Sequence, residues 1–227
     1  IWNNNPDEDF FRFREETCIQ TGRRMLERWQ RFGPLWILAG DGDYRSKEQD
    51  AKWKKIGRAV FDGYPDALAT MHPRGTSWIN DHYRDEPWFS FAGIQSGHGS
   101  SDYDLRFLVN GPYTYRWRDI GKPFINLEPN YEFARSYQDQ SLTYDDYHVR
   151  RAAWWSILGA PTAGVTYGSN PIWIWPLSTF SQAEGHGSNW AAAHWSTGLE
   201  TAGIASMTTM VDILDTLPWT ALRPADE

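Results

Sequence analysis

Two acidic residues, Asp41 and Glu128, closely follow short apolar segments and precede a glycine or a proline that turns the chain. Asp41 comes after Leu35–Ala39, and Glu128 comes after Phe124–Leu127. If both segments are strands of one parallel sheet, both carboxyl groups lie at the carboxyl edge of that sheet. One carboxyl group that keeps its proton and a second that is ionised can together cleave a glycosidic bond. The spacing therefore predicts a carboxylate pair of this kind.

Neither acid is diagnostic by itself. A single carboxylate at a strand end more often caps the next helix or pairs with an arginine, and only the pair favours catalysis. Asp43 is two residues from Asp41, so both side chains would point to the same face of an extended strand. Both are therefore candidates for the acid, although Asp43 lies further into the loop. On the later strand, Asn126 and Glu128 share one face, and we expect this polar face to point inward.

Other predicted strand ends carry polar side chains. His72, Gln95 and His98 could form hydrogen bonds with sugar hydroxyls or orient a carboxylate. Ordinary loop structure is the competing role for each of them. The strand-end position makes all three candidates for substrate binding.

Aromatic residues also follow the predicted strands. Tyr131, Tyr167 and Trp173 lie just past strand ends, where an aromatic face can pack against the apolar side of a sugar ring. Most of the 14 tryptophans instead fall at positions typical of a hydrophobic core. These three aromatic residues are therefore candidates for contact with a saccharide, and the role of Trp175 is left open.

The motifs of metal and nucleophilic-serine enzymes are missing from the sequence. No His-Glu-x-x-His pattern occurs, and no histidine pair has a compact spacing for metal ligands. Cys18 is the single cysteine, which excludes an internal disulfide and a cysteine-based zinc site. No Gly-x-Ser-x-Gly is present. The sequence predicts neither a metal nor a cofactor.

Composition narrows the possible partners. The chain has 227 residues, with 22 basic and 29 acidic side chains and a net charge of −7. No segment is basic enough to neutralise a run of phosphates, so nucleic acid is not expected as a partner. Its apolar runs are far shorter than the roughly 18 residues that a membrane span requires. The high aromatic content excludes a disordered chain, and the oligomeric state is left open.

Helix and strand signals alternate along the chain. Helices are predicted from Asn5-Pro6 to Gly33, from Ser46 to Gly63 and from Asp145 to Leu158; glycine and proline follow each one, and then an apolar run begins. This order is typical of an α/β protein with a parallel sheet covered by helices. The predicted strands are Leu35–Asp41, Ala67–His72, Phe89–Gln95, Phe124–Glu128 and Gly164–Tyr167.

Polar groups at the ends of all five strands favour a (β/α)₈ barrel over an open doubly wound sheet, which would usually show a glycine-rich phosphate loop. A closed barrel needs eight strands and roughly 250 residues.

A helix followed by five strands fits strands four to eight of such a barrel. We therefore expect residues 1–227 to form one catalytic-domain fragment that lacks the first three strands. Its open edges should make it unstable and nearly inactive alone.

Five motifs together resemble the apiosidase-like glycoside hydrolases of family 140. They are Trp36-Ile37-Leu38-Ala39-Gly40-Asp41, His72-Pro73-Arg74-Gly75, Gln95-Ser96-Gly97-His98, Glu128-Pro129-Asn130-Tyr131-Glu132 and Tyr167-Gly168. The resemblance implies a (β/α)₈ catalytic domain with an acid/base after strand four and a nucleophile after strand seven. Carried to this chain, it implies Asp41 as acid/base, Glu128 as nucleophile and Glu132 as a substrate contact. Relatives usually have a basic residue just after the first aspartate, where this chain has Gly42-Asp43.

The same resemblance implies a retaining mechanism on a plant cell-wall polysaccharide of the pectin type, with an oligo- or polysaccharide as the partner. It also implies a bacterial protein that is secreted or periplasmic. In relatives a small β domain follows the barrel, beyond the position of Pro218-Trp219. Two other functions are compatible with the residues, namely a carbohydrate-binding barrel without catalysis and an extracellular adhesion module.

Overall fold

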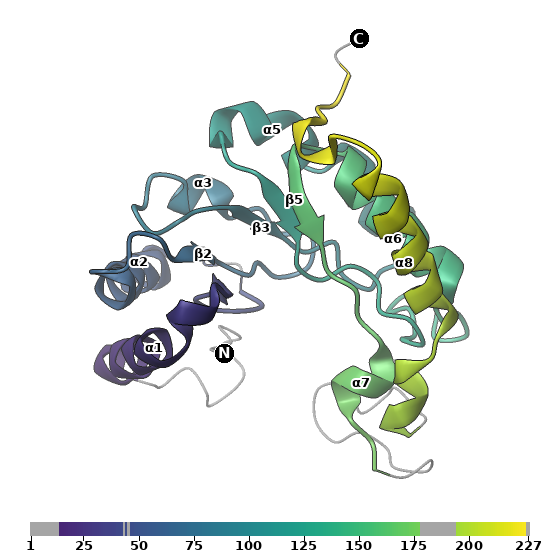
Figure 1. Cartoon of the computed structure of the whole chain (residues 1–227), viewed down its shortest axis with the longest axis horizontal. Helices are drawn as coiled ribbons and strands as arrows, with labels where there is room; N and C mark the ends of the chain where they lie inside the picture. The colour runs from purple at the N-terminus through teal and green to yellow at the C-terminus, as the bar shows by residue number, and fades with distance from the viewer. Residues whose placement is uncertain (1–13, 43, 45, 178–193, 226–227) are drawn as a thin grey trace.

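The computed structural model describes residues 14–42, 44, 46–177 and 194–225, and it shows a mixed α/β protein (Figure 1). A strand lies within or overlaps each of the five predicted segments, so the strand prediction is confirmed. The first four strands are shorter than predicted, and the fifth begins and ends two residues earlier, because each segment leaves the sheet before its last polar residues. They are β1 (Leu35–Ile37), β2 (Leu68–Thr70), β3 (Ala92–Ile94), β4 (Phe124–Asn126) and β5 (Thr162–Val165).

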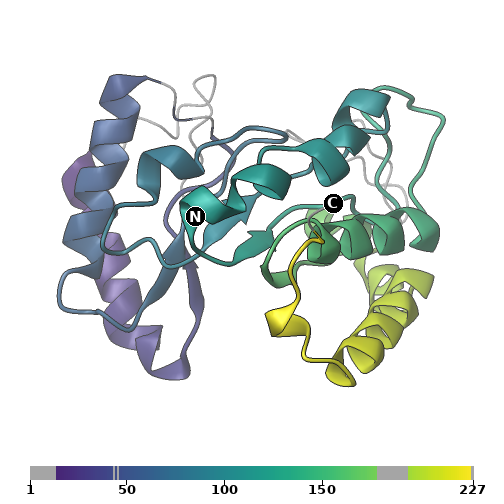
Figure 2. The same cartoon turned by 90° about the horizontal axis from the view of Figure 1, so that it is seen from above.

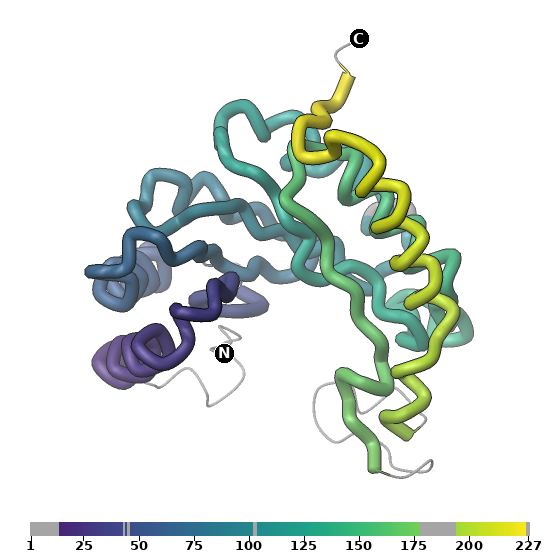
Figure 3. The backbone as a smooth tube through the Cα atoms, viewed as in Figure 1, coloured from purple at the N-terminus to yellow at the C-terminus, as the bar shows by residue number. Residues whose placement is uncertain are grey.

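The strands are parallel and follow one another in chain order. β1 pairs with β2, and β3, β4 and β5 form a second parallel group. A parallel bridge between Ala69 and Phe89 joins the two groups. Figure 3 shows that the chain advances from one end of an open arch to the other, with its first and last described helices far apart. The carboxyl ends of all five strands therefore point to one side of a curved row.

Three helices occur where the sequence predicts them: α1 (Glu15–Trp29), α2 (Lys47–Phe61) and α6 (Asp146–Leu158). The Ser46 hydroxyl accepts a hydrogen bond of 3.1 Å from the backbone of Gln49 and so caps α2. A capping box formed by Asp145 and His148 begins α6. These side chains satisfy backbone N–H groups that otherwise have no partner at a helix start. The predicted start at Asn5-Pro6 lies outside the described residues.

Apart from the 3₁₀ turn at Gln30–Phe32, which falls within the first predicted helix, the remaining helices were not predicted. The connection between β2 and β3 holds a single turn, which agrees with the weak helical pattern there. Most of the others lie between β3 and β4 or after β5. They are α3 (Asn80–Tyr83), α4 (Asp102–Asn110), α5 (Tyr113–Ile120), α7 (Asn170–Ile174), α8 (Ala202–Asp215) and the 3₁₀ turns η2 (Gln30–Phe32), η3 (Trp195–Leu199) and η4 (Trp219–Ala221).

Helices cover the outer side of the curved row of strands. Figure 1 shows α2, α3, α5 and α6 around the outside of the arch, and Figure 2 shows α1 beside α2 at one end and α6 beside α8 at the other. None of the helices in the described ranges is both long and apolar enough to span a bilayer.

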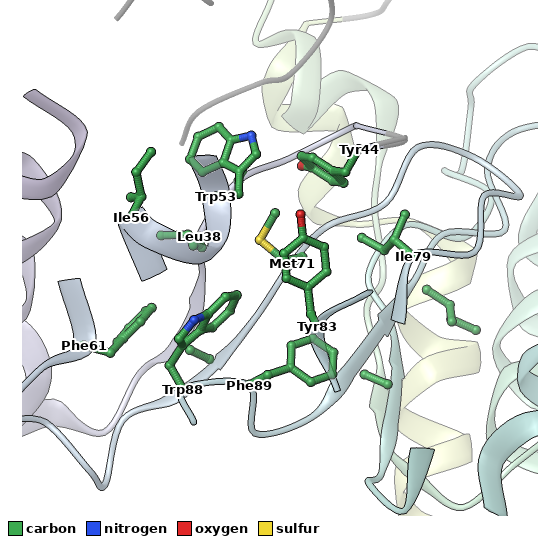
Figure 4. Close-up of a cluster of buried hydrophobic side chains, with 14 of the residues drawn as sticks. Leu38, Tyr44, Trp53, Ile56, Phe61, Met71, Ile79, Tyr83, Trp88 and Phe89 are labelled. Atoms are coloured by element: carbon green, nitrogen blue, oxygen red, sulfur yellow. The ribbon is translucent and has the colours of Figure 1, made fainter. Parts of the chain in front are cut away.

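A cluster of buried aromatic side chains fixes α2 and the first strands to each other (Figure 4). The rings of Tyr44 and Tyr83, both fully buried, meet edge to face with centroids 6.1 Å apart. Trp88 stacks on Phe61 at 5.8 Å. Edge-to-face and stacked pairs add specific geometry to the burial of apolar area. This cluster therefore holds in place the segments around the carboxyl ends of β1 and β2.

The opposite face of β1 and β2 is open. Leu35 and Leu68 are register partners and are 52% and 51% exposed, and Ile37 is 37% exposed. Ala69, which points to the other face, is fully buried. Alternation thus places these three aliphatic side chains on the side of the sheet turned away from the helices.

Replacing Gly57 by alanine tests how tightly this cluster is packed. A Cβ atom there would lie 2.3 Å from Cε2 of Trp88. We expect Gly57→Ala to lower the free energy of unfolding of the full-length protein by about 1–3 kcal/mol, as overpacking does, despite alanine's better helix propensity. In chemical denaturation, the loss should be smaller in a Trp88→Leu background. Equal losses in both backgrounds would show that the indole is not the obstacle.

Candidate active site

Glu128 lies two residues beyond the end of β4, with its carboxylate held by two histidines. Nε2 of His98 is 2.8 Å from Oε1 of Glu128, and Nε2 of His72 is 3.3 Å from Oε2. His72 follows β2 and His98 follows β3, so the carboxylate joins the ends of three successive strands. The backbone N–H of Gly97 also donates to the carbonyl of Glu128 at 2.9 Å. The Glu128 side chain is 21% exposed and can still be reached by a ligand.

The histidines set the charge of this carboxylate. Burial by itself would raise the pKa of Glu128, but its interactions with His72 and His98 outweigh burial and lower the pKa to about 2. Glu128 is therefore ionised at neutral pH. An ionised carboxylate suits attack on a sugar carbon, whereas a general acid must keep its proton.

Asp41 lies in the turn that follows β1. Its φ angle is +53°, a left-handed conformation that aspartate tolerates better than most residues. Gly42 forms a parallel bridge with Pro73, and its carbonyl accepts a hydrogen bond of 2.8 Å from the N–H of Arg74. These backbone contacts hold the Asp41 turn beside the loop after β2.

Asp41 and Glu128 line the same pocket, which has a volume of about 420 Å³. Both acids also lie near one phenol. Burial, followed by the neighbouring groups Glu128, Tyr137 and Asp41, raises the pKa of Tyr131 above its ordinary value. The structure thus brings the two acids together; Asp43 lies outside the described residues. The other lining residues are Arg74, Gly75, Thr76, Gln95, Ser96, Gly97, His98, Gly99, Asp104 and Tyr137.

A larger cavity of about 800 Å³ lies at the opposite end of the sheet, where β4 and β5 begin. Its lining includes Trp117 and Trp219 but no carboxylate. Of these two cavities, only the smaller one has carboxylates that could cleave a bond.

Gln95 is placed for ligand binding. Its side chain lines the pocket although the residue is only 5% exposed. Its backbone carbonyl is fixed by the N–H of Thr76 at 2.8 Å, while its side-chain Oε1 has no hydrogen-bond partner among the described residues. A buried acceptor without a partner is costly, which makes Gln95 a candidate for ligand contact.

Asn126 lies beneath the pocket and does not line it. Its Nδ2 donates to the hydroxyls of Ser96 and Ser156, each at 2.9 Å, and its Oδ1 accepts from the N–H of Ser96 at 3.3 Å and of Glu128 at 3.4 Å. The residue is 1% exposed. It points inward as expected, but this network makes it a support for the Glu128 backbone.

A row of aromatic rings begins at His98, whose imidazole contacts the Glu128 carboxylate. The Tyr131 ring lies between His98, with centroids 4.3 Å apart, and Trp173, at 6.0 Å. Trp173 is 41% exposed. Tyr131 and Trp173 do not line the 420 Å³ pocket; they continue its His98 side outward.

Glu132 and Tyr167 are placed elsewhere than the sequence suggested. The Glu132 carboxylate, 1% exposed, accepts hydrogen bonds from the Gly203 N–H at 2.9 and 3.1 Å and from the Tyr167 hydroxyl. The Tyr167 oxygen also lies 2.7 Å from the Thr201 hydroxyl oxygen. These contacts attach the loop after β4 to the first turn of α8, where a negative charge is favourable. Neither side chain lines the pocket.

Several pocket residues were not predicted as site residues. Arg74 and Thr76 follow the His72-Pro73 strand end, and the strand-end rule could have found them. Asp104 and Tyr137 come from α4 and from the long loop after β4, and no local signal marks them. In the part of the chain that the structure describes, no three His, Cys, Asp or Glu side chains come together as a metal site would need.

Comparison with known proteins gives one family. The family model described as apiosidase-like, catalytic domain, matches residues 1–221. The chain is similar to a solved glycoside hydrolase, with 27% identity and a TM-score of 0.65 over 91% of this chain and 48% of the other. It also resembles a family 5 glycoside hydrolase from Bacteroides vulgatus ATCC 8482, with 24% identity and a TM-score of 0.70, over 91% of this chain and 46% of the other. It thus spans about half their length. No curated protein matches the chain.

Replacing Glu132 by alanine separates its structural role from substrate contact. The change leaves the Gly203 N–H and the Tyr167 hydroxyl without their acceptor, so we expect a loss of about 1–3 kcal/mol in the free energy of unfolding. Hydrogen exchange should become faster in the first turn of α8. Glu200→Ala, at an exposed position, is the control and should change stability by less than about 0.5 kcal/mol. Unchanged stability with a raised KM would instead make Glu132 a substrate contact.

Proposed function

The chain belongs to the apiosidase-like catalytic domain family, and on this premise we propose that it is a glycoside hydrolase that uses Asp41 and Glu128. One observation carries the proposal: both carboxyl groups line the same pocket, and the histidines keep Glu128 ionised. Two acids with different protonation states around one pocket are what glycoside cleavage needs.

In this mechanism Glu128 is the nucleophile. Its carboxylate attacks the anomeric carbon while Asp41 donates a proton to the leaving oxygen, so a glycosyl ester forms on Glu128 and the glycosidic bond breaks. Asp41, now ionised, then takes a proton from water, which hydrolyses the ester with overall retention. The two carboxyl groups of a retaining enzyme are about 5–5.5 Å apart, against roughly 6.5–9.5 Å in inverting enzymes.

We further propose that β1–β5 correspond to strands four to eight of a (β/α)₈ barrel, so that residues 1–227 are one part of a longer catalytic domain. The parallel order of the strands supports this assignment, as do the positions of Asp41 after the first strand and Glu128 after the fourth. The open face formed by Leu35, Ile37 and Leu68 and the half coverage of the similar structures support it too.

The proposed substrate is an oligo- or polysaccharide. Gln95 offers a buried acceptor for a sugar hydroxyl, and Arg74 and Tyr137 add donors at the pocket. Tyr131 and Trp173 supply ring faces on which further sugar units can pack. We propose further that the protein is a member of glycoside hydrolase family 140 and that its substrate is a pectin-type cell-wall polysaccharide. We also propose that it is a bacterial protein with a secreted or periplasmic location.

Replacing each acid by its amide, and comparing substrates with a poor and a good leaving group, tests the role of each acid. We expect Glu128→Gln to lower kcat by about 10³-fold or more on every substrate, because the nucleophile is lost. Asp41→Asn should cost about 10²–10⁴-fold on a saccharide, whose leaving oxygen needs a proton. With an activated aryl glycoside, formation of the intermediate needs little protonation, and the Asp41→Asn loss in that step should be much smaller. Steady-state and burst kinetics on the full-length protein measure both effects.

Glu200→Gln, at an exposed position, is the matched control and should leave both rates unchanged. Equal rates for Glu128→Gln and the wild type would remove Glu128 from the mechanism. Binding of oligosaccharides without any hydrolysis would favour a carbohydrate-binding barrel.

The stereochemistry of the first product tests the nucleophile directly. Proton NMR recorded early in hydrolysis should show the anomer of the substrate, since two displacements restore the configuration. The opposite anomer as first product would mean that Glu128 acts as a base on water.

A further inference from the structure

The two histidines that hold Glu128 differ in what their other ring nitrogens contact. Nδ1 of His98 is 3.3 Å from the backbone N–H of Tyr131, which can only donate. This nitrogen must therefore be unprotonated, and the proton of the His98 ring is on Nε2. A neutral His98 thus donates its single N–H to Oε1 of Glu128.

His72 has the opposite surroundings. Its Nδ1 is 2.9 Å from the carbonyl oxygen of Pro73, which can only accept, so Nδ1 carries a proton. Its Nε2 is 3.3 Å from Oε2 of Glu128, and an ionised carboxylate is also an acceptor. A neutral ring with the proton on Nδ1 would turn a lone pair toward that oxygen. Only the doubly protonated imidazolium satisfies both contacts.

We propose, resting on the proposed function, that His72 is a charged positioning residue and the counter-ion of the active site, while His98 is a neutral hydrogen-bond donor. The negative charge that the proposed reaction moves is on Glu128 in the free enzyme and on Asp41 in the glycosyl ester. His72 faces both acids, so it compensates this charge before and after the proton leaves Asp41.

The charged groups around His72 agree with this assignment. Glu128 faces it from the loop after β4, Asp41 from the turn after β1, and Arg74 follows on its own loop as a second cation at the pocket. Burial would lower the pKa of His72, but the Glu128 hydrogen bond and charge, the Pro73 carbonyl and Asp41 together raise it. Tyr131 stays a neutral phenol.

Ring nitrogen NMR on the full-length, ¹⁵N-labelled protein tests the protonation states without any reaction. At pH 7 we expect both ring nitrogens of His72 to carry protons and only Nε2 of His98 to do so, with signals assigned from His72→Gln and His98→Gln variants. Glu128→Gln should lower the pH at which His72 loses its charge. A His72 ring that is neutral at pH 7, or that titrates unchanged in Glu128→Gln, would overturn the proposal, whether or not the protein hydrolyses glycosides.

Steady-state kinetics compare the His72→Gln and His98→Gln variants directly. Glutamine can replace a neutral N–H donor but not a positive charge, so only His72→Gln should raise the pKa of Glu128. We expect the acidic limb of kcat/KM to move up by about one to three pH units in His72→Gln and little in His98→Gln. Equal shifts in the two variants, or no shift in His72→Gln, would contradict a charge on His72 alone.

Discussion

The arrangement of the site depends on one interaction, the contact of the Glu128 carboxylate with the imidazole rings of His72 and His98. Each of these residues follows a different strand, so their contacts at 2.8 and 3.3 Å can form only when β2, β3 and β4 are parallel and correctly in register. The sheet and the site therefore constrain each other. A shift of one strand by a residue would turn its side chains to the other face and separate the three groups.

Two supports lie behind this interaction. Beneath the pocket, Asn126 connects the Glu128 backbone to Ser96 and Ser156, so the strand, the neighbouring loop and α6 share one buried amide. Further out, Glu132 fastens the loop after β4 to α8. Buried polar networks of this kind fix a unique geometry when all members are satisfied. The Glu128 carboxylate is thus positioned by Asn126 and Glu132, neither of which lines the pocket.

The sequence was most informative where the signal is local. Short apolar runs next to glycine and proline located all five strands, and the Ser46 capping pattern located the start of one helix. α8 was missed because it is largely apolar around its circumference and Thr201 makes no side-chain cap. Glu132 looked like a pocket residue because it shares a motif with Glu128. Its true partner, the Gly203 N–H, is 71 residues away, and such long-range contacts leave no periodic trace.

The left-handed backbone at Asp41 restricts what evolution can place there. In that conformation a side chain crowds the adjacent carbonyl, at a cost of roughly 1–2 kcal/mol that glycine escapes and that short polar residues partly recover by local hydrogen bonds. Glutamate, the usual exchange for aspartate, would meet this strain and also carry its acid one carbon further. Glycine and asparagine fit the turn but have no proton to give in the proposed mechanism. The backbone and the proposed chemistry together therefore select the shorter acid.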